Sequence, residues 1–82
     1  MLAAEIESKV RTFLTDECGA PEGLGRDDRL FSTNTLDSLD IFSIINYLEG
    51  EFGVRVPPLE VGLDKMDSAA QIAEVVISLR ED

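Results

Sequence analysis

A serine hydroxyl flanked by acidic residues is the feature of this sequence that can do chemistry. Ser38 lies between Asp37 and Leu39, Asp40 follows, and an apolar repeat typical of a helix begins at the same point. A helix N-terminus has free N–H groups and the positive end of the helix dipole, so it stabilises an anion such as a phosphate carried on a serine oxygen. Serine and aspartate also cap helices with their side chains. The sequence therefore predicts either a helix cap or a phosphodiester site at Ser38.

The chain offers little else for catalysis. It has 82 residues and no histidine, which removes the commonest general base, the commonest metal ligand and the usual partner of a serine nucleophile. A domain of this size has neither a deep cleft nor an obvious way to raise the pKa of one carboxyl group of a pair by burial. The sequence therefore argues against catalysis by this chain on its own.

Three amphipathic helices are expected to position Ser38. Apolar residues recur at helical spacing in the ranges 3–17, 38–52 and 68–79, with one stripe in each. Gly53 stands where a left-handed C-terminal stop ends the second helix, and Asp67 or Ser68 is the expected N-cap of the last. The stripes are Ile6, Val10, Phe13 and Leu14, then Ile41, Ile44, Ile45, Leu48 and Phe52, then Ile72, Val75, Val76 and Leu79.

Two long connections join these helices. Glycine and proline break the periodicity between residues 19 and 25, and a polar segment continues to residue 34 with Leu30, Phe31 and Leu36 as its apolar anchors. We expect this loop to cross the bundle. The prolines at 57 and 58 force an extended connection, and residues 59–66 have room for one short helix. The prediction is a single all-α domain over residues 1–82, a small four-helix bundle of three longer helices and a short third helix.

The charge of the chain restricts its partners. The net charge is −10, from 17 acidic and 7 basic residues, which disfavours nucleic acid and anionic lipid and favours basic protein surfaces. No apolar run is long enough for membrane insertion, and no secretory signal is present. Cys18 is the only cysteine and has no mate for an intramolecular disulfide, and we assign it no role. We expect a monomer in a reducing cytoplasm.

These motifs together resemble those of the acyl carrier protein family. The sequence LDSLD opens an acidic amphipathic helix, the pair Leu30-Phe31 precedes it, and EFGVRVP follows. The resemblance covers nearly the whole chain. It implies a four-helix carrier whose serine, here Ser38, is esterified by 4'-phosphopantetheine, a covalent cofactor whose terminal thiol holds acyl groups as thioesters. The absence of histidine fits this implication, because the thiol comes from the cofactor and the acid–base groups come from other enzymes.

Within that family, the segment VPPLEVGLDKMDSAAQIAEVV is more similar to D-alanyl and other aminoacyl or peptidyl-type carriers than to fatty-acid carriers. Ser43 and Gly50 occupy positions that are often acidic in fatty-acid carriers, which argues against recognition by fatty-acid synthase enzymes. Asn34 stands where a glycine is usual, and asparagine tolerates left-handed geometry. We have no physical reason for Gly50 inside a helix.

The resemblance also implies the partners. They are a phosphopantetheinyl transferase, an adenylating ligase or acyltransferase that loads the cargo, and a ketosynthase or other acceptor enzyme. The pathways left open are polyketide or nonribosomal peptide assembly and cell-wall D-alanylation.

Five residues near Ser38 are expected to contact these enzymes. Leu39 and Phe42 lie off the apolar stripe, and acidic side chains nearby attract basic surfaces. The alternative for the acids is a solvated helix face, and for the two apolar side chains it is packing against the first loop. The five are Asp37, Leu39, Asp40, Phe42 and Glu49, with Glu51 as a further acid on the same helix.

Two other classes of protein compete with a carrier. One is an acidic helical interaction module in which Ser38 is only a helix cap and nothing is attached. The other is a calcium-binding helical protein, but no segment has the D-x-[DN]-x-[DN]-G ligand spacing of an EF-hand.

Overall fold

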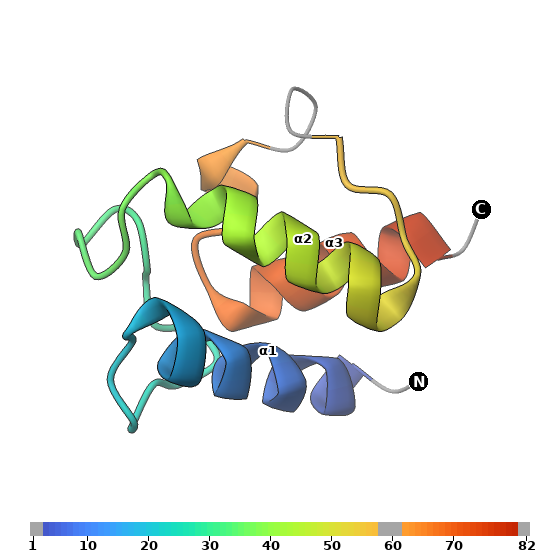
Figure 1. The fold of residues 1–82 in the computed structure, drawn as a ribbon. Coiled ribbons are helices and arrows are strands. Elements are labelled where there is room, and N and C mark those ends of the chain that lie inside the picture. Colours follow the sequence, from blue (N-terminus) through green and yellow to red (C-terminus); the bar gives the residue numbers. More distant parts are fainter. Residues whose placement is uncertain (1–2, 58–61, 81–82) are drawn as a thin grey trace.

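The computed structural model describes residues 3–57 and 62–80 and contains three α-helices (Figure 1). They are α1 (Ala3–Cys18), α2 (Asp40–Phe52) and α3 (Ala69–Arg80), and a short 3-10 turn, η1 (Leu63–Lys65), lies between α2 and α3. α1 runs in the direction opposite to α2 and α3. The described residues contain no strand, so the all-α prediction is confirmed for them.

The predicted short helix is present only as the three residues of η1. Part of its expected range lies outside the described residues, so the described part of the chain does not confirm a four-helix bundle. Within the same part of the chain, no helix is long and apolar enough to cross a membrane.

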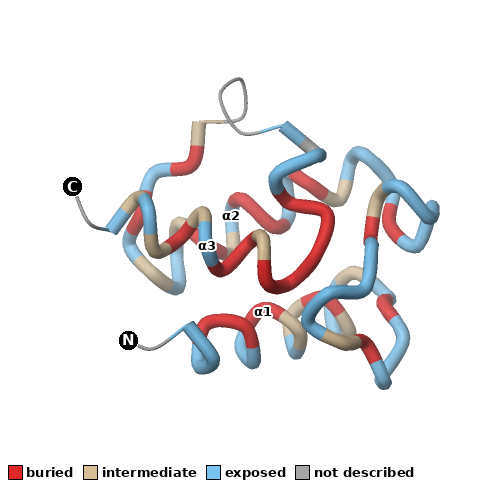
Figure 2. Tube along the Cα trace, turned by 180° about the vertical axis from the view of Figure 1, so that it is seen from behind, coloured by how far each residue is buried: buried red, intermediate tan, exposed pale blue. Residues whose placement is uncertain are grey.

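The core lies between the three helices, and most residues of the predicted stripes are buried in it (Figure 2). Leu14, Leu48 and Ile72 are fully buried at its centre. Burial of such side chains is the main source of stability in a domain this small. Four residues of the predicted stripes lie at the margin of the core and are only partly buried, namely Phe13, Phe52, Val75 and Leu79.

The partly buried aromatic residues form the contact between α1 and α2. Phe13 of α1 stacks on Tyr47 of α2 with ring centroids 4.2 Å apart, and Tyr47 meets the edge of Phe52 at 6.1 Å. Lys9 of α1 also forms an ion pair of 2.9 Å with Glu51 of α2. Glu51, expected as a further partner-facing acid, is therefore engaged within the chain.

The first loop packs against α1 and the start of α3. It lies at the end of the bundle where α1 ends and α2 begins (Figure 1), so the prediction that it crosses the bundle is not confirmed. The Arg26 carbonyl oxygen accepts the N–H of Ala70 at 2.9 Å, and its guanidinium donates two hydrogen bonds, of 2.8 and 2.9 Å, to Glu7. Of the predicted anchors, Leu30 and Leu36 are buried and Phe31 is partly buried. The loop is therefore a packed part of the fold.

Both ends of α2 can be compared with the sequence prediction. Gly53 has φ 69° and donates its N–H to the carbonyl oxygen of Glu49 at 3.1 Å, which confirms the left-handed stop. The start is wrong by two residues, because α2 begins at Asp40 and not at Ser38. Residues 37–39 form tighter turns with bonds between residues three apart, a common geometry at helix ends.

Candidate functional site

Ser38 lies in an exposed turn at the entrance to α2. The turn is held by backbone bonds from Asp40 N–H to the Asp37 carbonyl oxygen at 2.9 Å and from Ile41 N–H to the Ser38 carbonyl oxygen at 3.3 Å. The Ser38 side chain takes no part in these bonds. Its hydroxyl is exposed, and within the described residues it makes no hydrogen bond.

The prediction that Ser38 or Asp37 caps α2 with its side chain is wrong. Leu39 occupies the N-cap position in helical geometry (φ −71°, ψ −23°), and no side-chain cap is present there. A side-chain cap requires a residue with extended geometry just before the helix. No side-chain cap bond is present at the start of α2, so capping does not explain a serine at this position.

The segment before Ser38 is folded back on itself. The N–H of Leu36 donates to the carbonyl oxygen of Leu30 at 2.9 Å, and the N–H of Asn34 donates to that of Phe31 at 3.1 Å. Asn34 has φ 60°, the left-handed conformation that its place in the sequence predicted. This closed loop directly precedes the serine turn.

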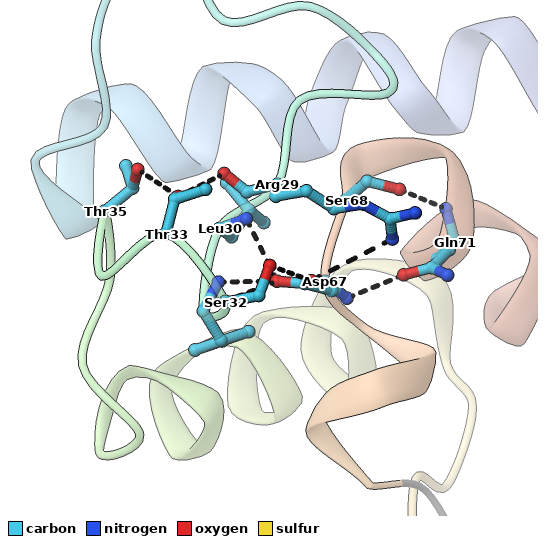
Figure 3. Close-up of polar contacts among 9 residues, drawn as sticks. Arg29, Leu30, Ser32, Thr33, Thr35, Asp67, Ser68 and Gln71 are labelled. Carbon is cyan, nitrogen blue, oxygen red and sulfur yellow. Dashed lines mark hydrogen bonds and ion pairs between the residues drawn. The ribbon is translucent and has the colours of Figure 1, made fainter.

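Asp67 fixes that loop to the start of α3 (Figure 3). One carboxylate oxygen, Oδ1, accepts the backbone N–H groups of Leu30, Phe31 and Ser32 at 3.0, 2.6 and 3.1 Å. The other, Oδ2, accepts the Ser32 hydroxyl at 2.7 Å and lies 3.9 Å from the guanidinium of Arg29. A single buried side chain thus satisfies three backbone donors of the first loop.

The sequence predicted Asp67 or Ser68 as the N-cap of α3, and the structure confirms Ser68. The Ser68 Oγ accepts the N–H of Gln71 at 3.2 Å, while Gln71 Oε1 accepts the N–H of Asp67 at 2.9 Å. Burial raises the pKa of Asp67, but the hydrogen bonds from Ser32, Phe31 and Leu30 together outweigh it and place the pKa below its ordinary value. Asp67 is the supporting residue that sequence reasoning missed.

The two predicted apolar contact residues flank the serine turn and face solvent. Leu39 is 73% exposed and Phe42 is 57% exposed, and the described residues contain no other large apolar side chain that is exposed. Packing against the first loop, the alternative for these side chains, is therefore not seen. The monomer leaves an apolar pair uncovered beside Ser38.

The acids predicted to meet partners fall into two groups. Asp37 is exposed beside Ser38. Asp40 is partly exposed and accepts the N–H of Asp37 at 3.0 Å. Glu49 lies towards the other end of α2, where its Oε2 accepts the N–H of Val56 at 3.0 Å. Glu49 thus stabilises the connection after α2, which is a structural role in addition to the predicted contact.

Cys18 ends α1 and is partly buried. Burial and the negative charges of Asp40 and Glu17 raise the pKa of its thiol to about 11. A thiol with this pKa is neutral at pH 7 and a poor nucleophile. Cys18 therefore adds no reactive group to the site.

The serine turn has the properties that a covalently attached phosphate group needs. The Ser38 hydroxyl is exposed, and the turn depends on none of its hydrogen bonds. In the described part of the chain, the backbone N–H groups of Ser38 and Leu39 donate to no other group and lie at the positive end of α2. These donors favour an anion at this position, so a phosphodiester fits the site.

Comparison with known proteins agrees with this geometry. Residues 8–76 match the family described as phosphopantetheine attachment site. The D-alanyl carrier proteins of Streptococcus sanguinis (strain SK36) and Streptococcus gordonii are each 41% identical to the chain over 54 residues, which cover 66% of this chain and 68% of each relative. The D-alanyl carrier protein of Streptococcus mutans is 37% identical over the same length.

The family match includes the serine turn, the first loop and most of α3. Phosphopantetheine, when bound, supplies a flexible arm with a terminal thiol, which no side chain of the site provides. The chain belongs to the phosphopantetheine attachment family, and it is a carrier protein whose covalent cofactor is 4'-phosphopantetheine.

Proposed function

We propose that Ser38 is the attachment residue and that the protein carries a small aminoacyl group, of the D-alanine class, as a thioester on the cofactor. The observation that supports the attachment site most directly is the exposed Ser38 hydroxyl, which is not used by the fold and lies inside the matched residues 8–76. The protein is then the substrate of its partner enzymes.

Attachment follows from the chemistry of a serine hydroxyl and coenzyme A. The Ser38 oxygen forms a bond to the phosphorus that carries the pantetheine arm, and the pyrophosphate bond of coenzyme A breaks. The adenosine bisphosphate leaves with the bonding electrons, and the hydroxyl proton passes to a base of the phosphopantetheinyl transferase. The free N–H groups of Ser38 and Leu39 stabilise the phosphodiester that results.

The cargo is supported by the relatives and by the chain itself. The Streptococcus proteins compared above are D-alanyl carriers, and the segment after Val56-Pro57 resembles aminoacyl carriers. An adenylating ligase activates the amino acid with ATP and loads it, and an acyltransferase receives it. This proposal favours D-alanylation over the polyketide and nonribosomal peptide pathways, in which a ketosynthase or a peptide-forming enzyme is the acceptor.

The partner surface is proposed to centre on Leu39 and Phe42 with Asp37 at its edge. The two apolar side chains are exposed beside the serine, and the net charge of −10 steers basic enzymes towards the carrier.

Intact-protein mass spectrometry tests the attachment residue. Incubation with a phosphopantetheinyl transferase and coenzyme A should add one phosphopantetheine group to the wild type and none to Ser38→Ala. Ser43→Ala, which removes an exposed serine from the first part of α2, should be modified normally. Modification of Ser38→Ala would show that another residue carries the group.

Tandem mass spectrometry of the protein isolated from its own cell tests the cargo. The ejected arm should bear an aminoacyl group with the mass of alanine. A series of fatty acyl chains of increasing length, or a polyketide intermediate, would contradict the proposed cargo and leave the attachment residue unaffected.

A further inference from the structure

The Asp40 side chain is directed at the serine turn itself. Its Oδ2 accepts the backbone N–H of Asp37 at 3.0 Å, and its own N–H donates to the carbonyl oxygen of Asp37 at 2.9 Å. Asp40 therefore holds both polar backbone groups of Asp37. The two bonds close a ring that includes Ser38.

The chain just before this ring is fixed as well. The N–H of Leu36 donates to the carbonyl oxygen of Leu30 at 2.9 Å, and both leucine side chains are buried. The Leu36 bond fixes the chain on one side of Asp37, and the Asp40 carboxylate fixes Asp37 itself. The backbone on both sides of Ser38 is therefore held by hydrogen bonds, and one of them is made by the Asp40 carboxylate.

We propose that Asp40 is a positioning residue for transfer of phosphopantetheine, because its carboxylate holds the Asp37 N–H and so fixes the turn that presents Ser38. This inference rests on the proposed function of Ser38. Transfer of a phosphoryl group requires the attacking oxygen to lie in line with the leaving group, so a loosened turn slows the reaction even when the enzyme still binds the carrier.

The hydrogen bond and the charge of Asp40 can be separated experimentally. Asparagine keeps an oxygen that can accept the Asp37 N–H, but it lacks the negative charge that would attract a basic transferase. Alanine loses both. The pair Asp40→Asn and Asp40→Ala therefore distinguishes positioning by the hydrogen bond from recognition by charge.

The experiment measures kcat and KM for a phosphopantetheinyl transferase with coenzyme A and each carrier variant. KM for the carrier should rise in both Asp40 variants, because both lose the charge. The value of kcat should fall by roughly tenfold in Asp40→Ala, within the range that misplacement of a reacting group costs, and Asp40→Asn should recover most of the loss. Glu22→Gln, which removes one exposed acid from the first loop, controls for net charge.

Amide hydrogen exchange of Asp37 gives a second readout that needs no enzyme. The Asp37 N–H should exchange roughly tenfold faster in Asp40→Ala than in the wild type, the scale of one lost hydrogen bond, and should stay protected in Asp40→Asn. Thermal melting establishes that the variants are folded.

Equal kcat values in the two Asp40 variants would overturn the proposal and assign Asp40 to charge recognition alone. Unchanged exchange of the Asp37 amide in Asp40→Ala would overturn it too. Failure of the proposed function has a different signature, since Ser38→Ala would then still be modified.

Discussion

The carboxylate of Asp67 accepts the backbone N–H of Phe31 at 2.6 Å, although 36 positions separate the two residues in the chain. Together with the bonds from Leu30 and Ser32, this contact attaches the loop that leads to Ser38 to the start of α3. The loop that precedes the serine turn is therefore held by a residue far from it in sequence.

Removal of this carboxylate should destabilise the fold. Asp67→Ala leaves the backbone donors of Phe31 and Ser32 without their acceptor, while the Leu30 N–H keeps its bond of 2.8 Å to the Asp67 carbonyl oxygen. We expect a loss of about 3 kcal/mol in the free energy of unfolding. Ser32→Ala removes a single hydrogen bond to the same carboxylate and should cost about 1 kcal/mol. Urea denaturation measures both. Similar values for the two variants would mean that the backbone bonds to Asp67 contribute little.

The contribution of Asp67 should depend on pH. Its hydrogen bonds outweigh burial and hold its pKa below the ordinary value of 3.8, so the unfolded chain binds the proton more readily than the folded one. The stabilisation is therefore fully present above the unfolded pKa and is lost as the pH falls through the folded pKa. The difference in unfolding free energy between the wild type and Asp67→Asn should narrow as the pH falls below the ordinary value of 3.8. A difference that stays constant over this range would contradict the lowered pKa.

The contribution of Glu7 to stability should also decrease as the pH falls. The hydrogen bond from Arg26 lowers its pKa below the ordinary value of 4.5, so this group also stabilises the fold at neutral pH and loses that effect in acid. The stability of Glu7→Gln should accordingly be furthest below that of the wild type above pH 4.5. Thermal melts of both proteins at a series of pH values measure this, and a larger difference in acid would contradict the assignment.

Gly50 and Gly53 should respond in opposite ways to alanine. Gly50 is exposed inside α2, and a Cβ there would meet no atom of the rest of the protein within 4 Å, beyond the adjacent backbone of the helix itself. Gly50→Ala should therefore stabilise the protein by about 1 kcal/mol through helix propensity. Gly53 has φ 69°, and Gly53→Ala should cost about 1 kcal/mol because a side chain is strained there. Denaturant titrations of the two variants give the comparison. A destabilised Gly50→Ala would show that the glycine has a role that the helix geometry does not reveal.

Alanine substitutions of Phe42 and Ile45 should separate an effect on partner binding from an effect on folding. Phe42 is 57% exposed and Ile45 only 6%, although both belong to α2. Phe42→Ala should leave the melting temperature nearly unchanged and weaken transfer by a partner enzyme, whereas Ile45→Ala should cost about 2 to 5 kcal/mol of stability. Thermal melts and transfer assays test both statements. If Phe42→Ala destabilises as much as Ile45→Ala, Phe42 belongs to the core and the proposed partner surface reduces to Leu39 and the nearby acids.

The sequence predicted the helices and the exposed apolar pair because both follow from periodicity. Residues such as Ile44 and Leu48 recur at helical spacing and are buried, and Phe42 lies off that stripe and is exposed. The left-handed geometry of Asn34 and Gly53 was also predictable, since few residue types adopt it.

The anchoring of the first loop could not be predicted in the same way. Asp67 binds backbone N–H groups, which every residue except proline carries, so no residue type in the loop identifies its partner. The start of α2 was misplaced for a related reason. The tight turn through residues 37–39 is defined by backbone bonds and by the Asp40 carboxylate, while the residue types suggested an ordinary side-chain cap.

The bonds from Leu30, Phe31 and Ser32 to Asp67, and from Ala70 to Arg26, make the first loop and the C-terminal helix one cooperative unit. If either the first loop or the helix detached, donors and acceptors of the other would lose their hydrogen-bond partners. The two should therefore unfold together. A chain truncated after η1 would keep every residue of the serine turn. It would nevertheless lose the carboxylate and the helix that hold the preceding loop in shape.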